Sequence, residues 1–129
     1  MGFKTRFSDL FRSSGIREDG GFSWGKLDSP EVVQDILTDH SSRIHVVFKH
    51  STRCGLSSMM LRRFERNWKE ADAVFHLLDI LQQRDLSERI SRELDCRHQS
   101  PQVLLIRDGK LLAHASHGDI PGLSPTDYA

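Results

Sequence analysis

The chain has 129 residues, and its 18 Lys and Arg side chains are balanced by 18 Asp and Glu side chains. This length suits one domain with one hydrophobic core, and the neutral charge gives no electrostatic reason to expect a nucleic acid or an anionic membrane as partner. The two cysteines, Cys54 and Cys96, do not form the dense pattern of a secreted disulfide scaffold, so we expect a reducing cytoplasm. No apolar run approaches the roughly 18 residues that a membrane-spanning helix needs.

Residues 1–21 are predicted to be an N-terminal extension, and residues 22–129 the domain. Apolar residues of the extension could form one face of a short helix, and these are Phe3, Phe7, Leu10 and Phe11. Such a helix could dock on a membrane surface or a partner, or the segment could be a loosely packed extension. The polar, glycine-containing stretch 13–21 is typical of a linker.

The first helix of the domain is predicted to start at Ser29–Pro30, with Ser as the cap and Pro at the first helical position. Residues 45–48 form a β-rich apolar run that predicts a buried strand. A polar loop over 49–53 follows, and then Cys54 opens a segment with apolar residues at helical spacing. Those residues are Leu56, Met60, Leu61, Phe64 and Trp68.

The second half of the domain has a nearly continuous apolar run over 73–78, which predicts a parallel strand covered on both faces. Asp85 and Glu88 have the spacing of a capping box, so a helix is expected to follow them. Strands over 103–106 and 111–115 are predicted to form a hairpin with a turn between them. This order of elements predicts an α/β sandwich with a small mixed sheet.

Cys54 is the candidate nucleophile, because the pattern places it where a strand ends and a helix begins. The first N–H groups of a helix have no intrahelical partner and carry partial positive charge. A thiolate is stabilised there and its pKa falls, so the position predicts a low-pKa cysteine. Arg53 adds a positive charge next to Cys54. The alternative is that Cys54 is an inert structural cysteine.

Two stretches resemble the bacillithiol-system redox-active proteins, the monothiol bacilliredoxins. They are Phe48–Ser57 (FKHSTRCGLS) and His98–Lys110 (HQSPQVLLIRDGK), and His114–His117 (HASH) is similar to the closing motif of that family. The resemblance covers about residues 22–120 and implies a thioredoxin-like three-layer sandwich. The C-terminal end is expected to be shortened, and residues 1–15 are a candidate to cover the sheet in its place.

Ser57 stands at the position where dithiol oxidoreductases carry their second cysteine. A hydroxyl cannot form a disulfide, but it can donate a hydrogen bond to a thiolate, so we predict a monothiol thiol–disulfide oxidoreductase. The resemblance implies that it removes bacillithiol from protein mixed disulfides. Bacillithiol would then be a co-substrate, S-thiolated client proteins would be the partners, and no cofactor would be bound.

The resemblance also implies a substrate site around the cysteine. We expect the Ser100–Pro101 bond to be cis and Ser100 to offer main-chain hydrogen bonds to the bound thiol. Thr52, Arg53 and Gly55 would contact the substrate from the other side, with Arg53 binding a carboxylate of bacillithiol. Gly55 is a departure, because the family often has Pro there.

His50 and His98 are expected near Cys54, as acid–base groups or as contacts to an acidic thiol, or else in structural roles. Cys96 is a possible resolving cysteine, and its alternative role is packing at a helix end. No set of Cys and His residues has zinc-ligand spacing, and His114 and His117 are predicted to point to opposite faces of a strand.

Two other functions compete with this one. Cys54–Ser57 (CGLS) also resembles the CGFS motif of monothiol glutaredoxins, which are iron–sulfur carriers that use glutathione. The glutathione loop of those proteins is missing here. The third possibility is a non-catalytic stress adaptor on a thioredoxin-like scaffold.

Overall fold

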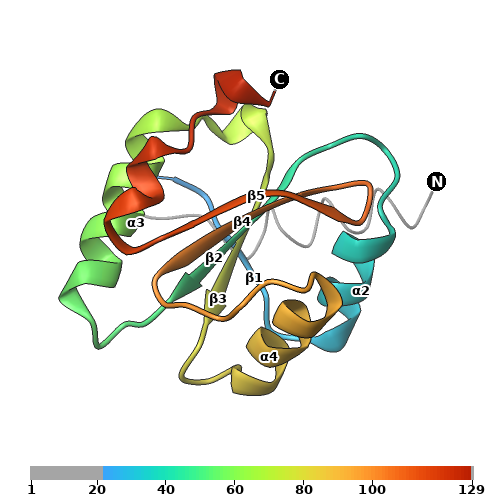
Figure 1. Ribbon diagram of the computed structural model, residues 1–129, viewed down its shortest axis with the longest axis horizontal. Helices are drawn as coiled ribbons and strands as arrows, with labels where there is room; N and C mark the ends of the chain where they lie inside the picture. Colours follow the sequence, from blue (N-terminus) through green and yellow to red (C-terminus); the bar gives the residue numbers. More distant parts are fainter. Residues whose placement is uncertain (1–21, 129) are drawn as a thin grey trace.

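The computed structural model describes residues 22–128, so the expectations for residues 1–21 lie outside the described part. A five-stranded sheet with the strand order β1-β3-β2-β4-β5 carries helices on both faces (Figure 1). The strands are β1 (Gly25–Lys26), β2 (His45–His50), β3 (Val74–Asp79), β4 (Gln102–Arg107) and β5 (Lys110–Ser116). The helices are α2 (Pro30–Thr38), α3 (Gly55–Asn67) and α4 (Arg84–Glu93).

The sheet is mixed, as predicted. β1 and β2 each pair in parallel with β3, whereas β4 pairs antiparallel with β2 and β5. Every residue of β2 is buried, because this strand lies in the centre of the sheet with helices on both sides. The expected turn between β4 and β5 is present at Asp108–Gly109, where both residues have a positive φ.

The sheet separates two hydrophobic clusters. One cluster joins the sheet to α2 and α4 through residues such as Val33, Val47 and Ile90. The other joins it to α3 and to the C-terminal segment through an aromatic group that includes Trp24, Phe48, Phe64, Trp68 and Phe75. This is the expected α/β sandwich with three layers.

The C-terminal end is short, as predicted, and it covers part of the sheet itself. Two 3₁₀ turns, η2 (His117–Gly122) and η3 (Pro125–Asp127), take the place of a closing helix. Ile120 and Leu123 are buried in the cluster beneath α3, and the indole Nε1 of Trp68 donates to the carbonyl oxygen of Leu123 at 3.1 Å. The expected cover by residues 1–15 lies outside the described part.

Several local predictions were wrong. β2 runs to His50, so Lys49 and His50 belong to the strand and not to a polar loop. α4 begins at Arg84 with Gln83 as N-cap and no side-chain cap, so Asp85 and Glu88 form no capping box. His117 starts η2 rather than continuing a strand. Leu56 is 40% exposed instead of belonging to the buried stripe of α3.

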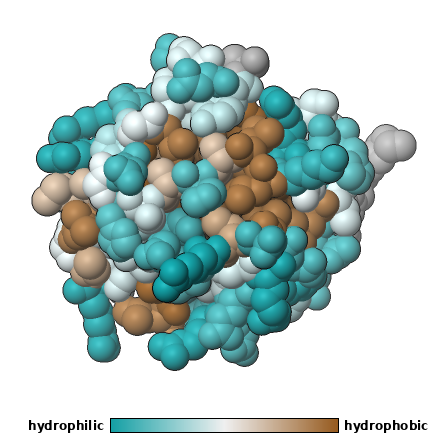
Figure 2. All heavy atoms as spheres, viewed as in Figure 1, coloured by the Kyte–Doolittle hydropathy of each residue, from teal (hydrophilic) through white to brown (hydrophobic). Residues whose placement is uncertain are grey.

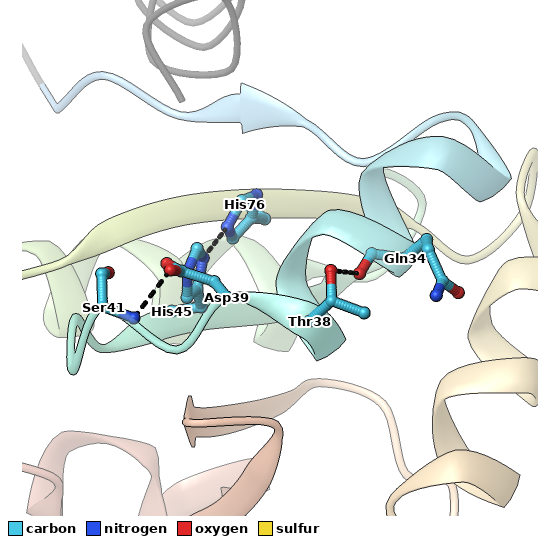
Figure 3. Close-up of polar contacts among 6 residues, drawn as sticks. All are labelled: Gln34, Thr38, Asp39, Ser41, His45 and His76. Atoms are coloured by element: carbon cyan, nitrogen blue, oxygen red, sulfur yellow. Dashed lines mark hydrogen bonds and ion pairs between the residues drawn. The ribbon is translucent and has the colours of Figure 1, made fainter. Parts of the chain in front are cut away.

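A polar chain connects Asp39, directly after α2, to His45 of β2 and His76 of β3 (Figure 3). Nε2 of His45 is 2.6 Å from a carboxylate oxygen of Asp39, and Nδ1 of His45 is 3.0 Å from Nε2 of His76. We assign an Nε2–H tautomer to both rings, so that each donates toward the carboxylate. Burial lowers the pKa of both histidines, and the hydrogen bond to Asp39 opposes this for His45.

The outer strand of the sheet is less covered than its centre. Figure 2 shows hydrophobic residues gathered near the middle of one face, in the region where β4 and β5 run, with hydrophilic residues around them. Most residues of β5 are half-buried, in contrast to β2. Among residues 22–128, no helix is both long enough and apolar enough to cross a bilayer.

Candidate functional site

Cys54 lies where the sequence predicts it, at the N-cap of α3. A tight turn leads from β2 into the helix, because the amide of Cys54 donates to the carbonyl oxygen of Ser51 at 3.2 Å. The carbonyl oxygen of Cys54 then accepts the amide of Ser58 at 3.2 Å, which begins the helix. The thiol is unpaired and partly exposed. It is therefore accessible at the start of the helix, and its side chain makes no capping hydrogen bond to a backbone N–H.

Ser57 holds this turn in place. Its side chain is fully buried, and its Oγ accepts the amide of Ser51 at 3.1 Å and lies 2.6 Å from Nδ1 of His50. Burial lowers the pKa of His50, opposed by the charge of Asp79, so the ring is neutral, and the tautomer of that ring sets which of the two groups donates. The hydroxyl thus connects the end of β2 to the first turn of α3. The expected hydrogen bond from Ser57 to the Cys54 thiolate stays a prediction.

The other predicted residues of the turn are on the surface. Thr52, Arg53 and Gly55 are exposed around Cys54. No atom lies within 4 Å of the place where a Cβ on Gly55 would stand, so the departure from the family pattern is not explained by crowding. All three residues are accessible to a substrate, and their roles remain predictions.

The Ser100–Pro101 peptide bond is cis, which confirms that expectation. Pro101 comes directly before β4, and Gln102 pairs with Lys49 of β2. The cis peptide therefore lies beside the end of β2, at the edge of the sheet from which the Cys54 turn starts. Ser100 is half-buried, and its main-chain contact to a thiol stays a prediction.

Lys49 is a residue of this region that the sequence reasoning missed. Its side chain is fully buried, and its ammonium group donates to Oγ of Ser91 at 2.8 Å and to the carbonyl oxygen of Ser87 at 3.2 Å. It also lies 3.1 Å from Nδ1 of His98. Burial lowers the pKa of Lys49 to about 8, so the group is mostly protonated at neutral pH. The sequence feature that could have indicated this burial is the position of Lys49 directly after the apolar run 45–48.

His98 is part of this group through one ring nitrogen. Oγ of Ser87 lies 3.2 Å from Nδ1 of His98, beside the contact from Lys49. An ammonium group has no acceptor capacity, so Nδ1 accepts and the ring proton of neutral His98 is on Nε2. The structure thus connects His98 to the strand that leads to Cys54.

Cys96 is buried in the cluster beneath α2 and α4. Its Sγ accepts from the side-chain amide of Gln102 at 3.7 Å, and burial raises the pKa of the thiol. This environment fits packing, and the resolving role stays an untested alternative. Within residues 22–128, no group of three or more His, Cys, Asp and Glu side chains is placed to hold a metal ion.

The sequence matches one family model, described as Monothiol bacilliredoxin BrxC, over residues 25–123. This range contains Cys54, Ser57 and the cis peptide.

Solved structures share the fold. A protein provisionally described as an oxidoreductase with a thioredoxin fold is 29% identical, with a TM-score of 0.65, over 74% of this chain and 83% of that chain. The thioredoxin of Malassezia sympodialis is 18% identical, with a TM-score of 0.66, over 84% of this chain and 91% of that chain. The thioredoxin of Trypanosoma brucei brucei is 20% identical, with a TM-score of 0.64, over 83% of this chain and 89% of that chain.

Proposed function

This chain belongs to the monothiol bacilliredoxin family, and we propose that it removes bacillithiol from protein mixed disulfides by exchange at Cys54. The observation that carries the proposal is the partly exposed thiol at the N-cap of α3, without a second cysteine at residue 57. Its position favours the thiolate, because the first-turn N–H groups and the helix dipole stabilise a negative charge.

The first step is an attack of the Cys54 thiolate on the bacillithiol sulfur of the mixed disulfide. A new disulfide forms between Cys54 and bacillithiol, the old disulfide breaks, and the client cysteine leaves as a thiolate. In the second step a thiolate of a second small thiol attacks the bacillithiol sulfur on Cys54. Cys54 is released as a thiolate, and the two small thiols leave as a disulfide, so the second thiol is the reductant.

Ser57 has a defined place in this scheme. A hydroxyl at residue 57 cannot displace bacillithiol from Cys54, so the mixed disulfide persists until an external thiol arrives. By fixing the turn between His50 and α3, the same hydroxyl keeps the sulfur at the N-cap throughout both steps. Ser100 and the cis peptide are proposed to bind the substrate on the β4 side, with Thr52, Arg53 and Gly55 on the other.

The surface next to Cys54 suits a protein client. Leu56 and Met59 are three residues apart on α3 and are 40% and 41% exposed, and Leu81 is 46% exposed in the β3–α4 loop. Large apolar side chains at this exposure can contact the segment around a client cysteine. We expect the exchange to take place in a reducing cytoplasm, where free thiols persist.

The test is a model protein with one cysteine in disulfide linkage to bacillithiol. Mixing it with the chain should release the free client thiol and place one bacillithiol on Cys54. The Cys96→Ser variant should behave like the unchanged chain, and Cys54→Ser should release nothing. Release by Cys54→Ser, or a need for Cys96, would reject the monothiol mechanism.

A further inference from the structure

A surface cleft of about 310 Å³ lies between the β3–α4 loop, the first turns of α4 and the segment before the cis peptide. Its lining residues are Ile80, Leu81, Arg84, Ser87, Glu88 and His98. None of the roles assigned so far uses the cleft as a whole. It combines two apolar residues at one side with charged and polar side chains from α4 and from residue 98.

The cleft lies at the same end of the sheet as Cys54. The amide of Ile80, at its edge, donates to the carbonyl oxygen of His50 at 3.0 Å, and the Cys54 turn starts at the next residue. His98, on its other side, is two residues before Ser100 of the cis peptide. Figure 1 shows the ends of β2 and β3 together at this end, with the starts of α3 and α4 beside them. The cleft and Cys54 thus share this end of the sheet, with α4 and α3 on its two faces.

Two cations lie at the cleft, one in its lining and one behind it. Arg84 lies on its surface, and the ammonium group of Lys49 lies behind His98, fully buried. Among residues 22–128, neither cation has a carboxylate within 4 Å, whereas a buried cation in a protein is ordinarily paired. Glu88 is the single acidic side chain of the lining and offsets only part of this charge.

His98 adds a fixed donor. Because its Nδ1 accepts from Lys49 and lies beside the hydroxyl of Ser87, its ring is oriented and its Nε2 carries the proton. Burial and the charges of Lys49 and Arg84 lower the pKa of His98, with Glu88 opposing them, which keeps the ring neutral at pH 7. A guanidinium and an N–H donor in one cleft form a suitable set for a carboxylate.

We propose that this cleft binds the carboxylate end of the small thiol that Cys54 carries, with Arg84 and His98 as the direct contacts and buried Lys49 as their electrostatic support. The inference rests on the proposed function and adds a specificity site to it. A small thiol with carboxylates is held at two places, by its sulfur at Cys54 and by its carboxylates at α4. A small thiol without carboxylates is held only by its sulfur.

The first experiment compares two disulfides on one model peptide, one with bacillithiol and one with 2-mercaptoethanol, which has no carboxylate. Arg84→Gln should lower the rate constant of transfer from the bacillithiol disulfide about tenfold, as expected for the loss of one charge-assisted hydrogen bond. The rate with the 2-mercaptoethanol disulfide should change less than about twofold. Arg92→Gln, the same charge change at the exposed far end of α4, is the matched control and should leave both rates unchanged.

The second experiment measures binding without exchange, with S-methyl bacillithiol as an unreactive probe followed by NMR. The amide signals of Arg84, Glu88 and His98 should shift, and Arg84→Gln should weaken the Kd about tenfold relative to Arg92→Gln. Equal Kd values for the two variants, or no shifts at the cleft, would overturn the inference. If the probe binds there while no disulfide transfers its thiol to Cys54, the proposed function fails and the carboxylate site stands.

Discussion

Ser57→Ala removes a fully buried hydroxyl that holds two partners, the amide of Ser51 and Nδ1 of His50. The variant adds no bulk and leaves little empty space, so the lost hydrogen bonds dominate the change in stability. Both partners stay buried after the substitution, because Ser51 is 9% and His50 is 7% exposed. They would then lack a polar partner in a place that water reaches poorly.

The expected cost follows from those two groups. A buried donor or acceptor that loses its partner costs about 1–3 kcal/mol, so the free energy of unfolding should fall by about 2–4 kcal/mol. For a domain of this size that corresponds to a fall in Tm of roughly 10 °C. The loss should slow thiol exchange as well, because the turn that positions Cys54 is no longer tied to α3.

Urea unfolding at pH 7 measures this effect, with a lower midpoint and an unchanged slope expected. Ser58→Ala is the matched control, since Ser58 is the next residue in the same helix and is only half-buried. Its effect should stay within about 0.5 kcal/mol. A loss below about 1 kcal/mol for Ser57→Ala would refute the structural role. A slower exchange at unchanged stability would instead favour the predicted hydrogen bond to the thiolate.

Three further outcomes are expected. Gly55→Pro should raise the free energy of unfolding by about 0.4–1 kcal/mol in urea, since the place for its side chain is open and Pro suits the first helical position; a loss of stability would contradict this. Lys49 has a pKa lowered from 10.5 to about 8, so the unfolded chain binds more protons between these values. Stability relative to Lys49→Met should therefore rise from pH 8 to 10.5, by about 3 kcal/mol, and a flat difference in urea midpoints would contradict the burial of a charged Lys49. His45 and His76 have pKa values lowered from 6.5 by burial, so their contribution is present above pH 6.5 and is lost as the pH falls below it. Thermal unfolding should show Tm falling from pH 7 to 5, and a Tm that rises over this range would contradict neutral rings for the two histidines drawn in Figure 3.

Local signals were enough for much of the fold. Ser29 accepts the amide of Val32 at 3.4 Å and Pro30 opens α2, as their residue types indicate. The apolar run over 73–78 became the parallel strand β3, and the thiol at residue 54 stands at a helix start. These features depend on residues that are close together in the sequence, so a local sequence pattern is enough to predict them.

Features that depend on distant residues escaped prediction. Lys49 is buried because its ammonium group finds partners 38, 42 and 49 residues away, which no local pattern contains. β1 has only two residues and exists through its pairing with His76 and Leu77 of β3. Ser57 was assigned to the thiolate from its spacing alone, and the structure gives its hydroxyl two partners at the end of β2.

Intact-protein mass after exposure to oxidised bacillithiol and, separately, to oxidised glutathione tests the account most directly. We predict one bacillithiol adduct on Cys54, retained in Cys96→Ser and lost in Cys54→Ser, and a smaller yield of the glutathione adduct because the chain belongs to the monothiol bacilliredoxin family. An unmodified Cys54 under these conditions, or an adduct that persists in Cys54→Ser, would contradict the account.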